Sequence, residues 1–424
     1  MRLTGEISKL SFEIDRMLGE GTQGAVFRAA VGGEALALKV YFPSFLAIDV
    51  GLGARLRAMV MVGTPSNRFL WPLETVTGEP DRFGYAMPLR GEQYVQMTDV
   101  IAGRAEPTFF AMATAGFELA DNFHNLHALG FSYQDISDRN IFMDPDSGRI
   151  EICDNDNVSV NGIPSAIAGT PDYMAPEIAL GEIDAPNEGT DLHSLAILLF
   201  RMLTLHHPFL GARELRYPVL TVQAARTLFH EQPVFMFDPA DESNHPVRGR
   251  HDLAERYWNI YPSYIRELFI EAFVNGTRDP AARVREQRWR DALLRMRDGI
   301  VVCAPCLSEN FEDPAKSQQR CWNCDAILAL PVHLRIGAQR VALNSTTRLF
   351  DHHVTAGKRY QFDDVRADIV AETHGHFGIR NLTKTTWRIL SNGDDPVAVE
   401  PGGLVPIALG TTVDFGGITG SIER

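Results

Sequence analysis

The sequence predicts an α+β protein in which a β-rich beginning is followed by a mostly helical segment and a β-rich tail. Three observations lead to this prediction. Residues 10–41 hold short β-prone segments joined by glycines, and residues 172–298 hold longer segments with helical spacing. Residues 331–424 hold short β-prone segments separated by Gly, Pro and Asn. The 424 residues are enough for two or three domains.

The composition is that of an ordinary globular chain. It is 45% hydrophobic and 22% charged, and no apolar run reaches the roughly 18 residues that a membrane-spanning helix needs. The first residues, MRLTGEISKLSFEID, lack the apolar centre of a signal peptide, so we expect a cytoplasmic protein. The formal net charge of −14 argues against broad binding to nucleic acid.

The β-rich beginning contains two glycine turns. The stretch LGEGTQGAVFRA at residues 18–29 runs through a glycine-rich loop into a β-prone segment, and Gly32-Gly33 joins that segment to EALALKVYF. Two β-prone runs joined by Gly-Gly predict a hairpin. Residues 45–62 have weak helical character, and residues 84–89 are expected to form a buried strand.

The helical segment follows several short strands. Residues 108–130 have helical spacing and end at a glycine, which is a typical stop signal. Short strands are expected around FSYQDI, NIFMD and RIEICD, and DLHSLAILLFRMLTL is apolar nearly all round, which predicts a buried helix.

Lys39 stands in the apolar run ALALKVY, after the glycine-rich loop. A buried ammonium without a partner is costly, so the side chain either extends to the surface or has a binding role. In the second interpretation Lys39 lies beneath the glycine-rich loop and neutralises phosphates.

Three polar residues stand near apolar, strand-like runs further along the chain, and Asp135 and Asp154 each follow such a run directly. Asp135 and Asn140 lie in YQDISDRN, and Asp154 lies in IEICDND. Mg²⁺ prefers hard oxygen ligands and usually takes only one or two from the protein. Asn140 and Asp154 fit that need, which leaves Asp135 to accept a proton from a hydroxyl group.

The glycine loop, the strand lysine, the D-x-x-x-x-N motif, the strand aspartate and GTPDYMAPE, in this order, resemble the protein kinase family. The resemblance covers roughly residues 10–298. It implies a bilobal kinase domain at residues 1–299, with an N-lobe at about 1–89 and a C-lobe at about 90–299. It also implies a serine/threonine kinase that uses ATP with Mg²⁺ or Mn²⁺.

The resemblance assigns roles residue by residue. Asp135 and Lys39 are the catalytic residues, and Asn140 and Asp154 hold the magnesium. The residues expected to bind the nucleotide are Gly19, Gly21, Gly24, Val26, Ala37, Lys39, Met87, Asn140 and Asp154. Asp191 is expected to anchor the catalytic loop, and Arg283 is expected to pair with Glu177 of the APE motif.

Four departures from the family pattern bear on activity. The family's H-R-D is Tyr133-Gln134-Asp135, so we expect activity that does not depend on phosphorylation of the activation segment. Ser137 replaces the catalytic-loop lysine, and D-F-G is Asp154-Asn155-Asp156.

The fourth departure is the missing helix glutamate that pairs with the strand lysine. The only carboxylate between Lys39 and Glu74 is Asp49. Asp49 substitutes for that glutamate, or Lys39 pairs with Asp154, or the site is degenerate. In the last case the chain is a pseudokinase scaffold that binds nucleotide and partners without efficient transfer.

Two pairs of cysteines follow the kinase-like region. Cys303 and Cys306 are separated by fourteen residues from Cys321 and Cys324, which is the spacing of a Cys₄ zinc ribbon, expected at residues 300–328. A closed site of four thiolates is structural rather than catalytic. Cys153 is interpreted as a small buried residue and not as a nucleophile.

The tail at residues 329–424 is expected to be a β-sandwich and faintly resembles forkhead-associated domains. The histidines of FDHHV and THGHFG are interpreted as surface or strand-edge residues. YQDIS, DNDNVS and GTPDYMAPE, with the zinc ribbon and β tail, resemble the kinase of bacterial phosphorylation triads linked to tellurium resistance. This resemblance implies a von Willebrand A-type protein and a PP2C-type phosphatase as partners.

Overall fold

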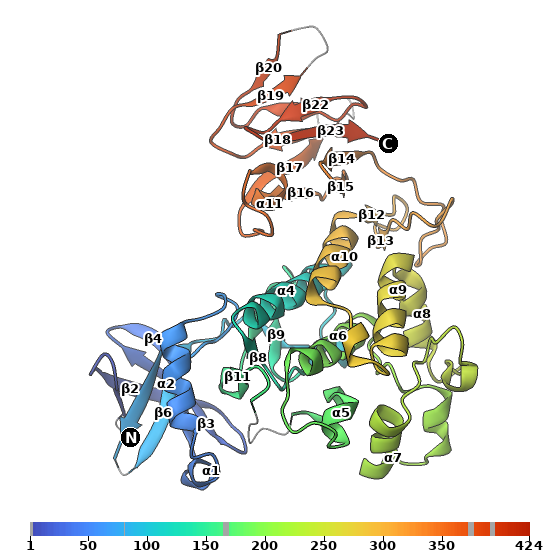
Figure 1. Ribbon diagram of the computed structural model, residues 1–424. Helices are drawn as coiled ribbons and strands as arrows, with labels where there is room; N and C mark the ends of the chain where they lie inside the picture. The colour runs from blue at the N-terminus through green and yellow to red at the C-terminus, as the bar shows by residue number, and fades with distance from the viewer. Residues whose placement is uncertain (1–2, 80, 164–168, 372–376, 391–394) are drawn as a thin grey trace. The chain divides into compact units, whose positions relative to one another are not determined.

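The chain is described here from a computed structural model (Figure 1), which describes residues 3–79, 81–163, 169–371, 377–390 and 395–424. It divides into two compact units, Met1–Leu293 and Leu294–Arg424. Mixed helices and strands make up the first unit, and short strands dominate the second. The α+β class expected from the sequence is therefore confirmed.

A closed six-stranded barrel begins the first unit, in the order β1-β2-β3-β4-β6-β5. The expected Gly32-Gly33 turn joins β3 to β4, and both glycines have positive φ (58° and 89°), which residues with a Cβ rarely adopt. The strands are β1 (Leu3–Gly5), β2 (Ser11–Glu20), β3 (Gly24–Val31), β4 (Glu34–Tyr41), β5 (Glu74–Gly78) and β6 (Arg82–Pro88).

The weak helical character of residues 45–62 corresponds to two short helices, α1 (Pro43–Ile48) and α2 (Leu52–Val62). They are interrupted near Gly51, which explains the weak periodicity. Helix α2 buries Leu52, Leu56 and Met59, and Figure 1 shows it alongside the barrel.

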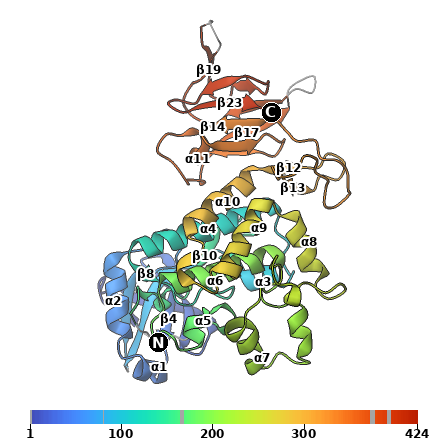
Figure 2. The same ribbon diagram turned by 45° about the vertical axis from the view of Figure 1, so that its right-hand side comes forward.

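Two long helices form the centre of the C-terminal lobe of the first unit. Helix α4 (Phe109–Ala128) is capped by the Thr108 side chain, and α6 (Glu188–Thr204) is capped by Asn187. They pack against each other (Figure 2), and α6 is buried along most of its length, as its apolar sequence predicts. Around them lie α3 (Met97–Ile101), α5 (Pro176–Ala179), α7 (Val222–Arg226), α8 (Asp252–Ile260), α9 (Ser263–Ile270) and α10 (Glu286–Asp298).

Short strands frame the segment that carries Asp135 and Asn140. Residues 133–140 connect β8 (Phe131–Ser132) to β9 (Ile141–Met143), and β10 (Ile150–Ile152) pairs with β9. Strands β7 (Val95–Gln96) and β11 (Ser159–Val160) pair with β9 and β8. The expected short strands are therefore present, with residues 133–140 as a loop between them.

Asp191 of the buried helix α6 anchors this loop. Its carboxylate accepts hydrogen bonds from the backbone N–H of Tyr133 (2.5 Å) and of Gln134 (2.9 Å). The anchoring role expected for Asp191 is confirmed. Because Asp191 is 1% exposed, the loop is fixed to the centre of the lobe.

His127, in the last turn of α4, adds a second connection to this anchor. Its Nε2 lies 3.0 Å from Oδ2 of Asp191, and its Nδ1 contacts the carboxylate of Glu286 at the start of α10. Burial by itself lowers the pKa of the His127 imidazole, but hydrogen bonds to the two carboxylates outweigh burial and raise the pKa to about 9.

Arg283 and Glu177 form the expected buried ion pair. Two N–H groups of the guanidinium donate to the two carboxylate oxygens, at 2.7 and 2.8 Å. Arg283 also donates to the carbonyls of Gly189 and Gly276. This bidentate pair fixes the end of the APE segment against the core of the lobe.

The second unit begins with the last turn of α10 and a β12–β13 ladder (Ile300–Val302 with Glu309–Phe311). Two sheets follow, in the orders β15-β14-β23-β22-β19-β20 and β16-β17-β18-β21. Both sheets contribute to one core that includes Leu334, Ala367, Ile379 and Trp387. Their strands are β14 (His333–Ile336), β15 (Gln339–Ala342), β16 (Arg348–Phe350), β17 (Val365–Ala371), β18 (Phe377–Asn381), β19 (Trp387–Leu390), β20 (Val397–Val399), β21 (Leu404–Pro406), β22 (Thr412–Asp414) and β23 (Thr419–Glu423).

The interpretation of the histidines in FDHHV as surface residues is wrong. His352 and His353 lie in the short helix α11 (Asp351–Val354) and are 5% and 1% exposed. Their Nδ1 atoms accept hydrogen bonds from the backbone N–H groups of Tyr360 and Phe350. These hydrogen bonds let the two rings be buried. The histidines of THGHFG lie outside the described residues.

We expect Arg283→Ala to destabilise the first unit by about 3–5 kcal/mol, because it leaves the carboxylate of Glu177 without its buried partner. Thermal unfolding followed by circular dichroism measures the effect. The matched control is Arg288→Ala, which removes an exposed pair with Glu271 and should cost about 0–1 kcal/mol. Equal losses in the two variants would contradict this account.

The His127 bridge predicts a pH-dependent stability. Because its pKa of about 9 lies above the usual 6.5, the stabilisation is complete below pH 6.5 and is lost as the pH rises through 9. We expect a loss of about 3 kcal/mol, seen as a lower unfolding midpoint at alkaline pH. In His127→Gln this part of the pH dependence should disappear. An identical pH profile in both proteins would rule out the bridge as its source.

Candidate active site

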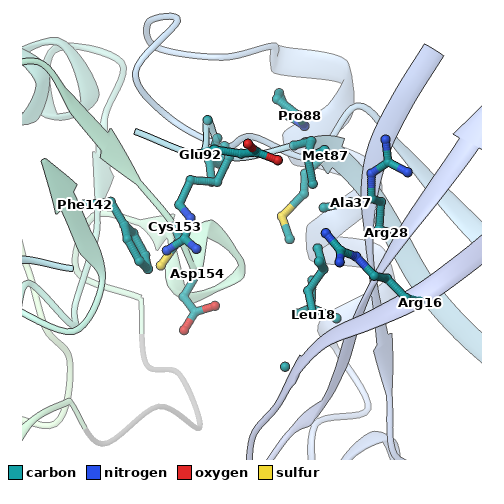
Figure 3. Close-up of a pocket in the computed structure, with 16 residues that line it drawn as sticks. Arg16, Leu18, Arg28, Ala37, Met87, Pro88, Glu92, Phe142, Cys153 and Asp154 are labelled. Atoms are coloured by element: carbon teal, nitrogen blue, oxygen red, sulfur yellow. The ribbon is translucent and has the colours of Figure 1, made fainter. Parts of the chain in front are cut away.

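A cavity of about 360 Å³ lies between the barrel and the C-terminal lobe of the first unit. Figure 3 shows Ala37, Met87 and Arg28 on one side of it and Phe142, Cys153 and Asp154 on the other. Of the residues expected to bind a nucleotide, those that line the cavity are Gly19, Val26, Ala37, Met87 and Asp154. Its volume and mostly apolar walls suit a small organic ligand.

The three glycines of the loop are required for different reasons. A Cβ at Gly19 or Gly21 would meet nothing within 4 Å, so these positions leave the backbone open toward a ligand. A Cβ at Gly24 would lie 2.2 Å from the carbonyl oxygen of Val40. Gly24 is therefore demanded by its close approach to strand β4, whatever its distance from phosphates.

Sequence reasoning missed three arginines that line the cavity, Arg16, Arg28 and Arg90. Arg28 follows Val26 by two residues in β3, so the alternation of side chains along a strand places both on one face. That alternation is the signal that could have found Arg28. The guanidinium of Arg90 lies 4.0 Å from the centre of the Phe142 ring, in a cation–π contact.

Lys39 is buried, and its ammonium has three side-chain partners. Its Nζ lies 2.8 and 3.0 Å from the two carboxylate oxygens of Asp156, 3.0 Å from Oε1 of Gln23 and 3.4 Å from Oδ1 of Asp154. Burial by itself lowers the pKa of the Lys39 ammonium, but the charges of Asp156 and Asp154 raise it to about 12. Lys39 is therefore a charged amine, and the interpretation that it extends to the surface is wrong.

Asp156 is held from the barrel as well. The hydroxyl of Tyr41 donates to Oδ2 (2.6 Å), and that of Tyr85 donates to Oδ1 (3.3 Å). The Asp156 side chain is 2% exposed. Burial acts to raise the pKa of this carboxyl, but Lys39 and Tyr41 outweigh burial and lower it, so Asp156 stays ionised.

Asp49 does not pair with Lys39. Its carboxylate accepts hydrogen bonds from Arg55 of α2, at 2.7 and 3.4 Å. The suggestion that Asp49 replaces the missing helix glutamate is therefore wrong. The suggestion that Lys39 pairs with Asp154 holds in part, because Asp154 is the more distant of its two carboxylate partners.

Asp135 is oriented by two donors. The hydroxyl of Thr170 donates to Oδ1 (2.7 Å), and Nδ2 of Asn140 donates to Oδ2 (3.0 Å). The same Asn140 nitrogen donates to the carbonyl of Asp135 (2.9 Å). Asn140 and Asp135 therefore form one fixed pair within the loop, and the amide oxygen of Asn140 is the atom that can coordinate a cation.

Asp154 lines the cavity with a side chain that is 45% exposed. Its backbone is left-handed (φ 49°), which directs the chain into a one-turn 3₁₀ helix at Asn155–Asn157. The backbone N–H of Cys153 donates to the carbonyl of Asn140 (2.9 Å), which ties the two expected magnesium ligands together. A carboxylate and an amide oxygen are the kinds of hard ligand that Mg²⁺ prefers, so these two residue types fit the ion.

Two of the residues that depart from the family pattern, Ser137 and Gln134, lie inside the lobe. Ser137 is a serine where the resemblance implies a lysine, so this position supplies no ammonium, and its side chain is fully buried. The Gln134 side chain donates to Oγ of Ser159 (2.8 Å) inside the lobe.

The four cysteines of the two C-x-x-C motifs in the second unit lie close together. All four Sγ atoms lie within 4.8 Å of one another; Cys303 is 3.6 Å from Cys324, and Cys306 is 3.5 Å from Cys321. Four sulfurs bound to one tetrahedral Zn²⁺ lie about 3.8 Å apart. The backbone N–H of Asn323 donates to Sγ of Cys321 (3.4 Å), as expected around a thiolate.

A second cluster, Asp298 with His352 and His353, fits a metal less well. Because the Nδ1 atoms of both rings accept backbone N–H groups, a neutral ring carries its proton on Nε2. The Nε2 of His353 then donates to Asp298 (3.3 Å), and the cluster is a hydrogen-bond network.

Within the part of the chain that the structure describes, every helix is too short or too polar to cross a membrane.

In the comparison with known proteins, residues 95–247 match the family model described as protein kinase domain. This region contains Asp135, Asn140, Asp154 and Asp191, but neither the glycine-rich loop nor Lys39. CBL-interacting protein kinase 4 of Oryza sativa subsp. japonica is 28% identical over 286 residues, which cover 62% of this chain and 60% of the relative. Protein kinase C eta type of Mus musculus is 28% identical over 214 residues, which cover 48% of this chain and 30% of the relative.

A third relative, ribosomal protein S6 kinase alpha-6 of Danio rerio, is 28% identical over 217 residues, or 47% of this chain and 27% of the relative. These three matches cover between 27% and 60% of the relatives' lengths. Residues 95–247, about a third of the chain, are therefore similar to the protein kinase domain, and the matching relatives are named as protein kinases at 28% identity.

Proposed function

We propose that this chain is an ATP- and magnesium-dependent kinase that phosphorylates serine or threonine residues of a protein partner and of itself. The observation that carries the proposal is the arrangement of Asp135, Asn140 and Asp154 next to the cavity that Ala37 and Met87 line. The match of residues 95–247 to the protein kinase domain supports it.

Each residue has a defined role in the proposed reaction. Asp135, with one oxygen held by Thr170 and the other by Asn140, orients the acceptor hydroxyl and takes its proton. Lys39 presents its ammonium to the α- and β-phosphates, and the open backbone at Gly19 and Gly21 covers them. Asn140 and Asp154 would hold a magnesium ion, which would supply positive charge against the phosphates.

A pseudokinase scaffold is the second candidate function. The observation that favours it is Ser137, which is fully buried where the resemblance implies a lysine that assists the γ-phosphate. Such a scaffold would bind nucleotide in the same cavity and would act through its partners.

The more specific biological role that we propose rests on the sequence resemblance. We include in the proposal a bacterial, cytoplasmic signalling role linked to tellurium resistance, with a von Willebrand A-type protein as substrate and a PP2C-type phosphatase as the opposing enzyme. The motifs YQDIS, DNDNVS and GTPDYMAPE, followed by the cysteine cluster and the β-rich second unit, support it.

We also propose a structural Zn²⁺ held by Cys303, Cys306, Cys321 and Cys324. The convergence of four sulfurs supports it, and the resulting ribbon would be a rigid docking or spacer module.

Asp135→Asn should reduce phosphoryl transfer by about 10²–10⁴-fold, because it removes the proton acceptor. The assay follows transfer from labelled ATP with Mg²⁺ to the chain itself and to a von Willebrand A-type protein. The matched control is Asp146→Asn, an exposed aspartate in the turn after β9, which should keep full activity.

Two outcomes would contradict the kinase proposal. One is absence of label on any acceptor when the wild-type chain binds ATP, which favours the scaffold. The other is an Asp135→Asn variant as active as the wild type.

The purified chain should contain about one zinc ion per molecule by elemental analysis. Cys306→Ser should lose the zinc and lower the thermal stability of the second unit, because metal binding contributes to folding. Cys153→Ser is the control and should keep the metal, since Cys153 lines the nucleotide cavity. A wild-type chain without zinc, or zinc that survives in Cys306→Ser, would disprove the site.

A further inference from the structure

We propose that Asp156 is the positioning residue for Lys39, so that the phosphate-binding ammonium is set by the turn that also carries Asp154 and not by a helix. This inference rests on the proposed nucleotide site and names a residue that sequence reasoning assigned no role.

The geometry of the ion pair is the first argument. Both carboxylate oxygens of Asp156 lie within hydrogen-bonding distance of Nζ of Lys39, at 2.8 and 3.0 Å. Both side chains are nearly inaccessible to solvent, with 6% of Lys39 and 2% of Asp156 exposed. A buried pair of this kind fixes the position of the ammonium, because either charge alone would be strongly destabilising.

The second argument is that Asp156 is itself immobilised. The hydroxyls of Tyr41, from β4, and Tyr85, from β6, each donate to one of its oxygens. Its backbone lies in the 3₁₀ turn Asn155–Asn157, where Asn155 Nδ2 donates to the carbonyl of Ile152 (3.0 Å). The carboxylate is therefore held from the barrel and from its own turn, as a positioning group requires.

The third argument is that the helices next to β4 provide no competing carboxylate. Asp49 is the only acidic residue between Lys39 and Glu74, and Arg55 occupies it at 2.7 Å. Movement of α2 therefore leaves the partner of Lys39 in place. The expected metal ligand Asp154 lies two residues before Asp156 in the same turn. Lys39 is therefore positioned by the segment that also carries this ligand.

The test compares the affinity of the full-length chain for ATP with its affinity for adenosine, each measured by displacement of a fluorescent nucleotide. Lys39 acts on phosphates, which adenosine lacks. In Asp156→Asn, ATP should bind at least about tenfold more weakly, the effect of losing one charge-assisted hydrogen bond. The affinity for adenosine should change less than about twofold.

Two further variants make the test specific. Asp49→Asn is the matched control, since it neutralises the one carboxylate that the sequence has between Lys39 and Glu74, and it should bind both ligands like the wild type. Tyr41→Phe removes one hydrogen bond to Asp156 and keeps its charge. Tyr41→Phe should weaken the binding of ATP, but not of adenosine, by a few fold. It provides the test if Asp156→Asn fails to fold.

The outcomes separate this inference from the proposed function. Equal weakening of ATP and adenosine, no weakening of either, or an ATP-specific loss in Asp49→Asn would each overturn the role of Asp156. If the wild-type chain transfers no phosphate, but Asp156→Asn still binds ATP more weakly and adenosine normally, only the proposed kinase activity would be overturned.

Discussion

The buried ion pair between Lys39 and Asp156 is the interaction on which the geometry of the candidate active site depends. Lys39 comes from the barrel and Asp156 from the turn after β10, so the pair joins the two lobes of the first unit at the cavity. Two buried charges are tolerated only when they are close and when their remaining hydrogen-bonding capacity is satisfied. Gln23 meets this condition for the ammonium, and Tyr41 and Tyr85 meet it for the carboxylate.

The other side of the site is fixed by hydrogen bonds to buried side chains. Asp191 holds the backbone of the loop at Tyr133 and Gln134, and Thr170 holds the carboxylate of Asp135. Residues separated widely in the sequence are thereby placed without help from a ligand. Preorganisation of this kind lowers the cost of orienting a reacting group, which is what phosphoryl transfer mostly requires of a protein.

Local patterns predicted much of this arrangement. The Gly32-Gly33 hairpin, the buried helix with Asp191 and the pair of Arg283 with Glu177 follow from turn chemistry, periodicity and motif order. The role of Asp156 could not be predicted that way, because its pairing joins residues 117 positions apart in a site where the resemblance implies a glycine. The burial of His352 and His353 could not be predicted either, because it depends on backbone N–H groups, which no sequence pattern reveals, that donate to the Nδ1 atoms of the two rings.

The most direct test of this account is a crystal structure of the chain with a non-hydrolysable ATP analogue and Mg²⁺. The account predicts Lys39 between Asp156 and the α- and β-phosphates, with the metal bound by Asn140 and Asp154. A structure in which another carboxylate has replaced Asp156 at Lys39, or in which the analogue is excluded from the cavity lined by Ala37 and Met87, would contradict it.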